Sequence, residues 1–345
     1  MFKLTEKSKI YIWGPTPEVF SGGAEVINML AAYLKSKGVD AKMFSWDMPE
    51  YYQPDFFKER YDVNCGSWSE IQNTEDTVII LPECMIENPE NLDFFINGLD
   101  KVQFLIWWLS SANVYSDRSY KTSKRLTMHD LRLLKNRSLH LCESEVTMRD
   151  LLYFGVTNRM SFQHGVNEVF FKHPVTSKKE QIVIYNAMKP KTAAFVRDKL
   201  IPMMPDVTFC EIKPTHWGEY LSKEELCDRF YDKAMIYLDF SGFEGREMMP
   251  REACLRDCVL FLGNEGNAET FDDYPIDDYY KINRYDDISI LCNKIRDVLN
   301  NYDSHIQNFE FFKNKCLYEP MKWEWETTQL FGKLFKNKNN SWIYF

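Results

Sequence analysis

The sequence of 345 residues lacks the marks of several protein classes. Its nine cysteines include no C-x-x-C pair and are scattered among mostly apolar neighbours, which is typical of reduced, buried thiols in an intracellular protein. Cys254 and Cys258 are one helical turn apart, but no histidine or third cysteine lies near them in the sequence, so two packed thiols are favoured over a zinc site. We therefore expect no metal.

Targeting and membrane-spanning patterns are also lacking. Residues 1–9 are polar and do not have the charged start and long apolar core of a signal peptide. The longest apolar runs, such as FLIWWL at 104–109, are far short of the ~20 residues of a membrane span. We expect a cytoplasmic protein. Two interpretations stay open for the tail KLFKNKNNSWIYF (333–345): peripheral contact with the anionic inner face of the plasma membrane, and a frayed polar end with a small apolar plug.

The sequence also lacks an excess of positive charge. The chain has 42 basic and 51 acidic residues, a net charge of -9, so no overall positive field attracts phosphate backbones and nucleic acid is excluded as the main partner. What is present is a globular composition, 45% hydrophobic and 27% charged, over a length that suits about two domains.

The chain alternates short apolar runs with helical patterns, which indicates βαβ units and parallel sheets. A polar interval, KHPVTSKKEQ (172–181), reads as a linker, so the fold class is α/β with two Rossmann-like, doubly wound domains that face a central cleft. We predict an N-terminal domain over 1–172, a C-terminal domain over 173–302, and a helical segment over 303–345 that crosses back to the first domain. The predicted strands are 9–14, 40–46, 77–83, 102–109, 138–144, 160–166, 182–188, 207–212, 234–240 and 259–264, and the predicted helices are 23–38, 90–99, 146–156, 192–201, 222–232, one from about 250, and a long helical ending over 286–335.

Gly22 and Gly23 stand between the first predicted strand and the helix after it. Paired glycines there let the backbone approach a ligand, while a helix N-terminus offers N–H groups to an anion. The segment lacks both G-x-G-x-x-G and G-x-x-x-x-G-K-[ST], so neither a dinucleotide fingerprint nor a triphosphate loop is supported. A flexible turn into a helix explains the pair equally well.

YNAMKPKTAAF (185–195) places two lysines at the end of a predicted strand. Lys189 and Lys191 precede a helix that the Thr192 hydroxyl can cap. Two ammonium groups beside a helix N-terminus suit a diphosphate. Two solvated loop lysines are the alternative.

FSGFEGREMMPREACLRDCVLFLG (240–263) sets Glu244 and Glu252 eight positions apart. Pro250 favours the first turn of a helix, so Glu252 has a structural explanation as a carboxylate at the positive end of the helix dipole. Glu244 has none, because it lies in a loop between Gly242 and Gly245. Carboxylates at strand ends are well placed to accept hydrogen bonds from sugar hydroxyls.

FEGREMMPREA (243–253) resembles the E-x7-E motif of retaining glycosyltransferases with the GT-B fold, in which the usual form is roughly E-G-x-G-x-x-x-x-E-A. The Gly22-Gly23 pair, HGVNEVF (164–170) and Lys189 follow the order of that family. The resemblance implies a transferase that moves a sugar from a nucleotide diphosphate-sugar donor to a glycan or lipid-linked glycan acceptor, as in the synthesis of bacterial surface polysaccharides. It implies no cofactor besides the nucleotide-sugar substrate, no metal, and an acceptor held by the first domain.

The same resemblance implies residue roles. Glu252 would accept hydrogen bonds from the ribose hydroxyls of the donor, and Glu244 would be the catalytic residue that contacts the transferred sugar. Lys189, with Lys191, would neutralise the departing diphosphate. The loop 213–217 would stack on the base. The predicted donor-binding set is Lys189, Lys191, Glu252, Gly245, Arg246 and His216, and the predicted acceptor or phosphate loop is Gly22 and Gly23.

The sequence departs from the family pattern at two places. Glu247 replaces the second glycine of E-G-x-G, which adds a carboxylate near the donor phosphates; Arg246 either offsets this charge or binds phosphate itself. The histidine that many members carry after a strand of the first domain is missing from WWLSSANVY (107–115), and His129 and His164 are the nearest candidates. These departures favour one alternative, a catalytically inactive GT-B-like protein that binds a sugar or nucleotide. A second alternative, a nucleotide-sugar epimerase or dinucleotide enzyme, uses the same kind of sheet, and the missing G-x-G-x-x-G counts against it.

Overall fold

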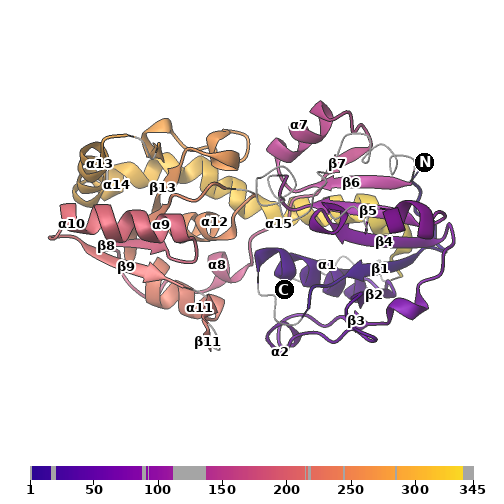
Figure 1. Ribbon diagram of the computed structural model, residues 1–345. Coiled ribbons are helices and arrows are strands. Elements are labelled where there is room, and N and C mark those ends of the chain that lie inside the picture. The colour runs from indigo at the N-terminus through magenta and orange to yellow at the C-terminus, as the bar shows by residue number, and fades with distance from the viewer. Residues whose placement is uncertain are drawn as a thin grey trace. The chain divides into compact units, whose positions relative to one another are not determined.

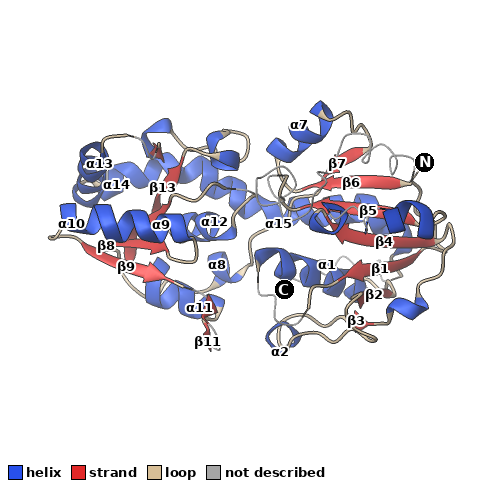
Figure 2. Ribbon diagram, viewed as in Figure 1, coloured by secondary structure: helices blue, strands red, loops and turns tan. Residues whose placement is uncertain are grey.

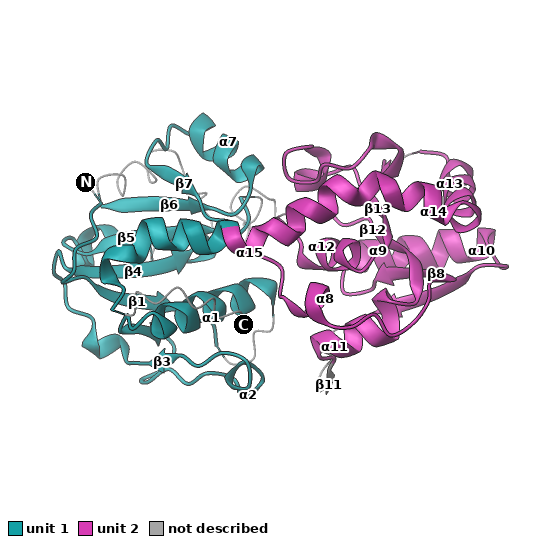
Figure 3. Ribbon diagram, turned by 180° about the vertical axis from the view of Figure 1, so that it is seen from behind, with its two compact units in different colours: residues 1–164, 322–345 teal, residues 165–321 magenta. Residues whose placement is uncertain are grey.

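The computed structural model describes residues 2–16, 21–87, 91, 93–111, 137–213, 215–216, 219–243, 245–283 and 286–336. It divides into two compact units (Figure 3). Unit 1 comprises residues 1–164 and 322–345, and unit 2 comprises residues 165–321.

Unit 1 is built on a parallel sheet of seven strands within the part of the chain that the structure describes (Figures 1 and 2). The order reverses between β1 and β4, which makes their carboxyl ends the topological switch point of this sheet. In spatial order the strands are β3 (Asn64–Cys65), β2 (Ala41–Phe44), β1 (Lys9–Trp13), β4 (Thr77–Pro82), β5 (Gln103–Trp108), β6 (Ser138–Cys142) and β7 (Arg159–Ser161).

Helices cover both faces of this sheet (Figure 1). Side chains alternate along β1, so that Ile12 packs into one apolar cluster and Tyr11 into the other. α1 (Gly22–Ser36) and the last turns of α15 (Glu310–Phe331) contribute to the first cluster, and α7 (Glu145–Tyr153) contributes to the second. The shorter helical segments of unit 1 are α2 (Asp55–Lys58), η1 (Trp68–Glu70), α3 (Cys84–Glu87), η2 (Phe94–Gly98) and η9 (Gly332–Leu334).

Unit 2 contains a second parallel sheet, and its order reverses between β8 and β12. In spatial order its strands are β14 (Lys281–Ile282), β13 (Val259–Gly263), β12 (Ala234–Asp239), β8 (Glu180–Asn186) and β9 (Thr208–Ile212), beside a hairpin of β10 (Thr215–His216) and β11 (Glu219–Tyr220). Its helical segments are α8 (Val169–Lys172), α9 (Pro190–Phe195), η4 (Val196–Leu200), α10 (Ile201–Met203), α11 (Lys223–Leu226), η5 (Cys227–Tyr231), α12 (Met248–Leu255), η6 (Gly266–Glu269), η7 (Asp278–Tyr280), α13 (Ile288–Asn300), α14 (Tyr302–Ile306) and η8 (Gln307–Phe309).

The prediction of two doubly wound α/β sheets is confirmed. The apolar runs identified the longer strands, because strands buried on both faces are almost continuously hydrophobic. The two-residue strands β3 and β14 and the hairpin were not predicted, since two residues carry no periodicity. None of the helices that the structure describes combines the length and apolar composition needed to cross a bilayer.

Unit 1 ends at residue 164 and takes up the chain again at residue 322, within α15. The domains predicted from the sequence, with limits after residues 172 and 302, stay a prediction. The polar interval 172–181 is part of unit 2 and not a free linker, because Arg256 Nη1 donates to the carbonyl oxygen of His173 at 2.8 Å. Arg256 is itself fixed by two 2.7 Å hydrogen bonds to Asp232.

Lys179, in the same interval, lies at the edge of the unit 2 sheet where the strands begin, and it holds that edge together. Its ammonium group donates to the carbonyl oxygens of Tyr231 at 2.6 Å, Ala234 at 2.8 Å and Arg256 at 2.6 Å. One side chain thus connects the start of β8 with the residues that precede and begin β12 and with the end of α12.

We expect Lys179→Met to lower the free energy of unfolding by about 1–3 kcal/mol, because three part-buried carbonyl oxygens lose their donor. Urea unfolding of the full-length protein measures the change. Lys178→Met is the matched control, since Lys178 is exposed. Equal unfolding midpoints for the two variants would contradict the anchoring role.

Candidate functional site

The carboxylate of Asp239 lies at the centre of the switch point of unit 2. Asp239 ends β12 and is fully buried. It accepts hydrogen bonds from Asn186 Nδ2 at 2.7 Å, Thr192 Oγ1 at 3.1 Å, Tyr237 Oη at 3.2 Å and the backbone N–H of Ser241 at 3.0 Å. A buried carboxylate needs such a set of donors, because an unpaired one would carry a large desolvation cost.

These hydrogen bonds join the two loops at the carboxyl ends of β8 and β12. Asn186 ends β8, and its Oδ1 accepts from the N–H of Met188 at 3.1 Å. The hydroxyl of Thr192 accepts from the N–H of Phe240 at 2.8 Å while it donates to Asp239. Burial, and next the Asp239 charge, raise the pKa of Tyr237 well above its usual range, so its hydroxyl remains a donor. The Lys189 loop and the Glu244 loop therefore have one common support.

The loop after β12 is held in a strained conformation. Phe243 has a φ of 38°, which is uncommon for a residue with a side chain, and its ring is buried 5.3 Å from the Tyr274 ring. The N–H of Asn267 donates to the Phe243 carbonyl oxygen at 3.0 Å. Gly266, with a φ of 59°, is so close that a Cβ there would lie 2.3 Å from the Gly242 carbonyl oxygen. The residue that precedes Glu244 is thus fixed by packing on both sides.

Two predicted side chains lie outside the described residues. These are Glu244 and the side chain of His216, and their roles stay predictions. For Glu244 the structure describes the neighbours Phe243 and Gly245, which belong to the supported loop. For His216 it describes only the backbone of β10.

Glu252 lies on the buried side of α12. Its carboxylate accepts a hydrogen bond from Tyr231 Oη at 3.1 Å and lies 3.6 Å from Lys223 Nζ. Burial, and next the Glu252 charge, raise the pKa of Tyr231 well above its usual range, so this hydroxyl is a permanent donor. The helix begins at Met248, two residues before Pro250, and Glu252 is therefore beyond its first turn. The helix-dipole explanation of Glu252 weakens accordingly.

Lys189 and Glu247 form an ion pair across the switch point. Lys189 Nζ lies 2.8 Å from Glu247 Oε1, and both side chains are partly exposed. Lys189 precedes α9, and Glu247 precedes α12 without capping it through its side chain. The structure therefore brings together Lys189, which the sequence predicts to bind the diphosphate, and Glu247, the residue that departs from the family pattern. Lys191 is exposed in the first turn of α9.

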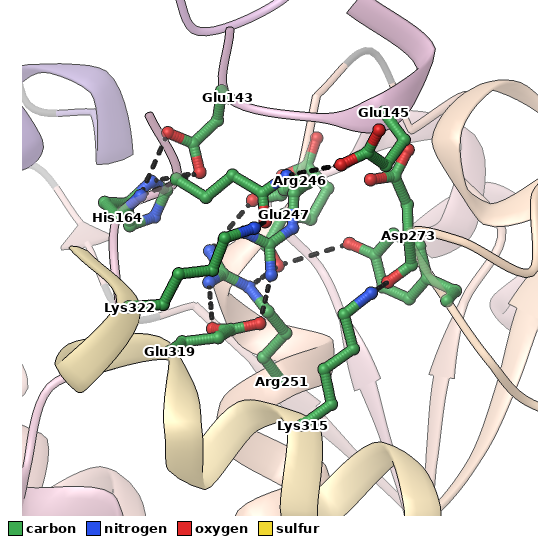
Figure 4. Close-up of polar contacts among 12 residues, drawn as sticks. Glu143, Glu145, His164, Arg246, Glu247, Arg251, Asp273, Lys315, Glu319 and Lys322 are labelled. Atoms are coloured by element: carbon green, nitrogen blue, oxygen red, sulfur yellow. Dashed lines mark hydrogen bonds and ion pairs between the residues drawn. The ribbon is translucent and has the colours of Figure 1, made fainter. Parts of the chain in front are cut away.

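Arg246 is directed into unit 2 and binds Glu319 of α15 (Figure 4). The same carboxylate accepts from Arg251 Nη1 at 2.7 Å, and Arg251 Nη2 donates to the Arg246 carbonyl oxygen at 3.1 Å. The Arg246 side chain is 1% exposed. Arg246 is thus an anchor of the loop in this structure, and the compensation of Glu247 comes from Lys189. The sequence contained no signal for this pairing, since Glu319 is distant in the chain.

In unit 1, Gly22 and Gly23 form the first turn of α1 and not a loop before it. Ser21 caps this helix by accepting from the N–H of Ala24 at 3.2 Å. Neither glycine has a positive φ, but a Cβ on Gly23 would lie 3.1 Å from a Leu109 methyl carbon. The pair lies beyond the carboxyl end of β1, at the switch point of its own sheet.

His164 is paired with Glu143 at the carboxyl end of β6 (Figure 4). Its Nδ1 lies 2.7 Å from Glu143 Oε1, and its backbone N–H donates to both carboxylate oxygens at 3.1 and 3.2 Å. Both side chains are buried, which favours a structural role for His164. His129 lies outside the described residues.

We expect Gly266→Ala to destabilise the protein by about 2–4 kcal/mol, because the methyl group would overlap a backbone carbonyl and the positive φ disfavours a side chain. Gly242→Ala is the matched control in the same loop, where a Cβ meets nothing closer than 3.8 Å. Thermal and urea unfolding measure both. If the two alanine variants lost equal stability, the packing of η6 on the loop would not be the constraint described above.

Comparison with solved structures identifies the fold as that of the GT-B glycosyltransferases. Anabaena HepE in complex with UDP and glucose matches 95% of this chain and 100% of its own, with a TM-score of 0.64 and 11% identity. Sucrose-phosphate synthase from Thermosynechococcus elongatus matches 95% of this chain and 99% of its own, with a TM-score of 0.60 and 12% identity. TarM matches 78% of this chain at a TM-score of 0.52 and 16% identity, over only 56% of its own length.

No protein-family model matches the sequence, and no curated protein matches it. Identities of 11–16% establish the fold alone.

Proposed function

We propose that the protein is a glycosyltransferase of the GT-B fold that moves a sugar, with retention, from a nucleoside diphosphate-sugar to a glycan or lipid-linked glycan acceptor. The observation that carries the proposal is the common support at the switch point of unit 2. Asp239 joins the loop that carries Lys189 to the loop that continues into Glu244, in a fold whose neighbours include HepE in complex with UDP and glucose. Parallel α/β sheets bind ligands at such points.

Each residue has a role in this proposal. Lys189 neutralises the diphosphate as the bond to the sugar breaks, which is electrostatic stabilisation of developing charge. Glu252 accepts hydrogen bonds from the ribose, and Tyr231 and Lys223 hold its carboxylate in place. Glu244 contacts the transferred sugar. No metal is required, because the charge of the leaving group is met by protein cations. Synthesis of a bacterial surface polysaccharide is the proposed context.

Glu247 makes donor binding an exchange of partners. The diphosphate displaces its carboxylate from Lys189, and the loop reorients the displaced charge toward solvent, where both side chains are already partly exposed. The same ion pair favours a second candidate function, that of a GT-B-like binding protein without transferase activity. In such a protein Glu247 would stay paired with Lys189 and keep it from the diphosphate.

Calorimetric titration with UDP, GDP, CDP, dTDP, ADP and CMP, with NAD as a control, tests donor binding. UDP is the first choice, because HepE was solved with it. We expect one nucleoside diphosphate to bind. Glu252→Gln should lower the affinity for that nucleotide at least tenfold, because the neutral amide is a poorer acceptor for ribose hydroxyls. Glu224→Ala, an exposed glutamate of the same unit, should bind like the wild type. Glu244→Gln should bind normally and transfer slowly. Absence of nucleotide binding would refute the proposal, and binding without transfer would favour the second candidate.

Glu247→Gln should raise the affinity for the same nucleoside diphosphate about three- to tenfold. The variant removes a negative charge beside the phosphates and the ion pair to Lys189, and a partly exposed ion pair of this kind contributes up to about 1 kcal/mol. Lys189→Met is the companion variant and should weaken binding. Weaker nucleotide binding by Glu247→Gln would mean that Glu247 contacts the donor directly and does not compete with it.

A further inference from the structure

A cavity of about 400 Å³ lies at the edge of the unit 1 sheet where β1 and β2 begin. Its lining residues come from four parts of the chain, within 6–11, 39–42, 70–72 and 334–336, and all of these belong to unit 1. The volume is at the lower end of the ~300–1,000 Å³ that is usual for small-molecule pockets. We call it the amino-edge cavity, and its size suits a ligand of one or two rings.

The amino-edge cavity lies at the opposite edge of the sheet from the predicted acceptor loop. In β1 it is lined by Lys9, Ile10 and Tyr11, which are the first three residues of this strand. Gly22 and Gly23 follow the other end of the same strand. Five residues that rise ~3.3 Å each separate the two edges by roughly 15 Å. The cavity is therefore not a part of the acceptor site that the sequence predicts.

The charges around the amino-edge cavity are balanced. Three carboxylates and three ammonium groups line it: Glu6, Asp40, Glu70, Lys9, Lys42 and Lys336. Lys42 Nζ and Glu70 Oε2 are paired at 2.5 Å, and this hydrogen bond raises the pKa of Lys42 and lowers that of Glu70. A lining without net charge does not attract a free anion or a free cation. The described residues also contain no group of acidic, histidine or cysteine side chains that is arranged to hold a metal ion.

Several polar groups of the lining have hydrogen-bonding capacity to spare. Within the described part of the chain, the side chains of Glu6 and Lys336 have no partner. Asp40 accepts one long hydrogen bond of 3.5 Å. Gln72 Oε1 accepts from Lys9 Nζ at 3.3 Å, which leaves the amide nitrogen of Gln72 as a donor. Acceptors and donors thus alternate around one cavity, and a ligand hydroxyl can use both because it donates and accepts.

The remaining part of the wall is apolar. Ile10, Val39 and Leu334 line the cavity and are otherwise buried. A sugar ring combines the same two properties, since it has C–H groups on its faces and hydroxyl groups around its rim. Carboxylates accept hydrogen bonds from such hydroxyls in many sugar-binding sites.

We propose that the amino-edge cavity binds a neutral saccharide of one or two sugar units. A charged ligand fits less well, because the six charges of the lining cancel, and a purely apolar ligand would leave them without water or partner. The site goes beyond the proposed transferase function and does not depend on it. It gives unit 1 a place to hold a glycan away from the carboxyl edge of its sheet.

Calorimetry and saturation-transfer NMR on the full-length protein test the site with glucose, galactose, mannose, N-acetylglucosamine, maltose, cellobiose and lactose. We expect at least one of them to bind with a dissociation constant of about 1 mM. Asp40→Ala and Lys336→Ala should each raise that constant about five- to tenfold, because a hydrogen bond to the ligand is lost. Both side chains are exposed, so melting temperatures should stay near that of the wild type. Glu75→Ala is the matched control, since Glu75 is an exposed carboxylate before β4 that does not line the cavity.

Three outcomes would overturn the proposal. The first is that none of these sugars binds at about 20 mM. The second is a sugar that loses binding in Glu252→Gln and keeps it in Asp40→Ala, because that sugar would occupy the proposed donor site and not the cavity. The third is binding of inorganic phosphate, but of no sugar, that Lys336→Ala abolishes, which would make the cavity an anion site.

The same titrations separate this inference from the proposed function. Saturation with the nucleoside diphosphate should leave the sugar affinity unchanged, since Glu252 and Lys189 do not line the cavity. A protein that binds a sugar through Asp40 and Lys336 but binds no nucleotide would refute the transferase and support the cavity site.

Discussion

The candidate ligand-binding loops of unit 2 are held in place by one buried carboxylate, that of Asp239, which accepts four hydrogen bonds. Asp239 takes hydrogen bonds from the end of its own strand, from the end of β8 and from the start of α9. Because the donors come from β8, α9, β12 and the loop after β12, the loss of the carboxylate would leave several buried polar groups unpaired at once. The positions of Lys189 and of the loop that leads to Glu244 therefore depend on a residue that contacts no ligand in the proposed reaction.

Electrostatically, the site is a set of paired charges and not a positive pocket. Lys189 faces Glu247, and Lys223 faces Glu252. A donor diphosphate would thus enter a region that is nearly neutral before it binds, in a chain of net charge -9. Long-range attraction contributes little in such a site, and affinity comes from short-range exchange of partners at Lys189. That exchange acts on the diphosphate that all such donors share, so discrimination between donors would have to come from the contacts with the base and the sugar.

The sequence predicted the architecture and pointed to the segment in which we propose the site, but it did not predict what holds that segment in place. Apolar runs and the spacing of the two glutamates are local patterns, and they identified the strands and the stretch around Glu252. The proline at 250 misplaced the helix start, since Pro is also accommodated at the third position of the first turn. The roles of Asp239 and of the Arg246–Glu319 pair could not be predicted, because they join residues that are distant in the chain and no periodicity encodes them.

At this switch point, the residues that hold the loops in place are different from the residues that would contact the donor. This difference bears on which substitutions such a protein can accept during evolution. Asp239, Asn186 and Thr192 are enclosed and bonded to one another, whereas Lys189, Lys191 and Glu247 project from the loop ends. Under the proposed function, substitutions at the projecting positions would change the affinity for the donor diphosphate and leave the enclosed network intact. A library for altering donor affinity should accordingly randomise the projecting positions and leave the enclosed three residues unchanged.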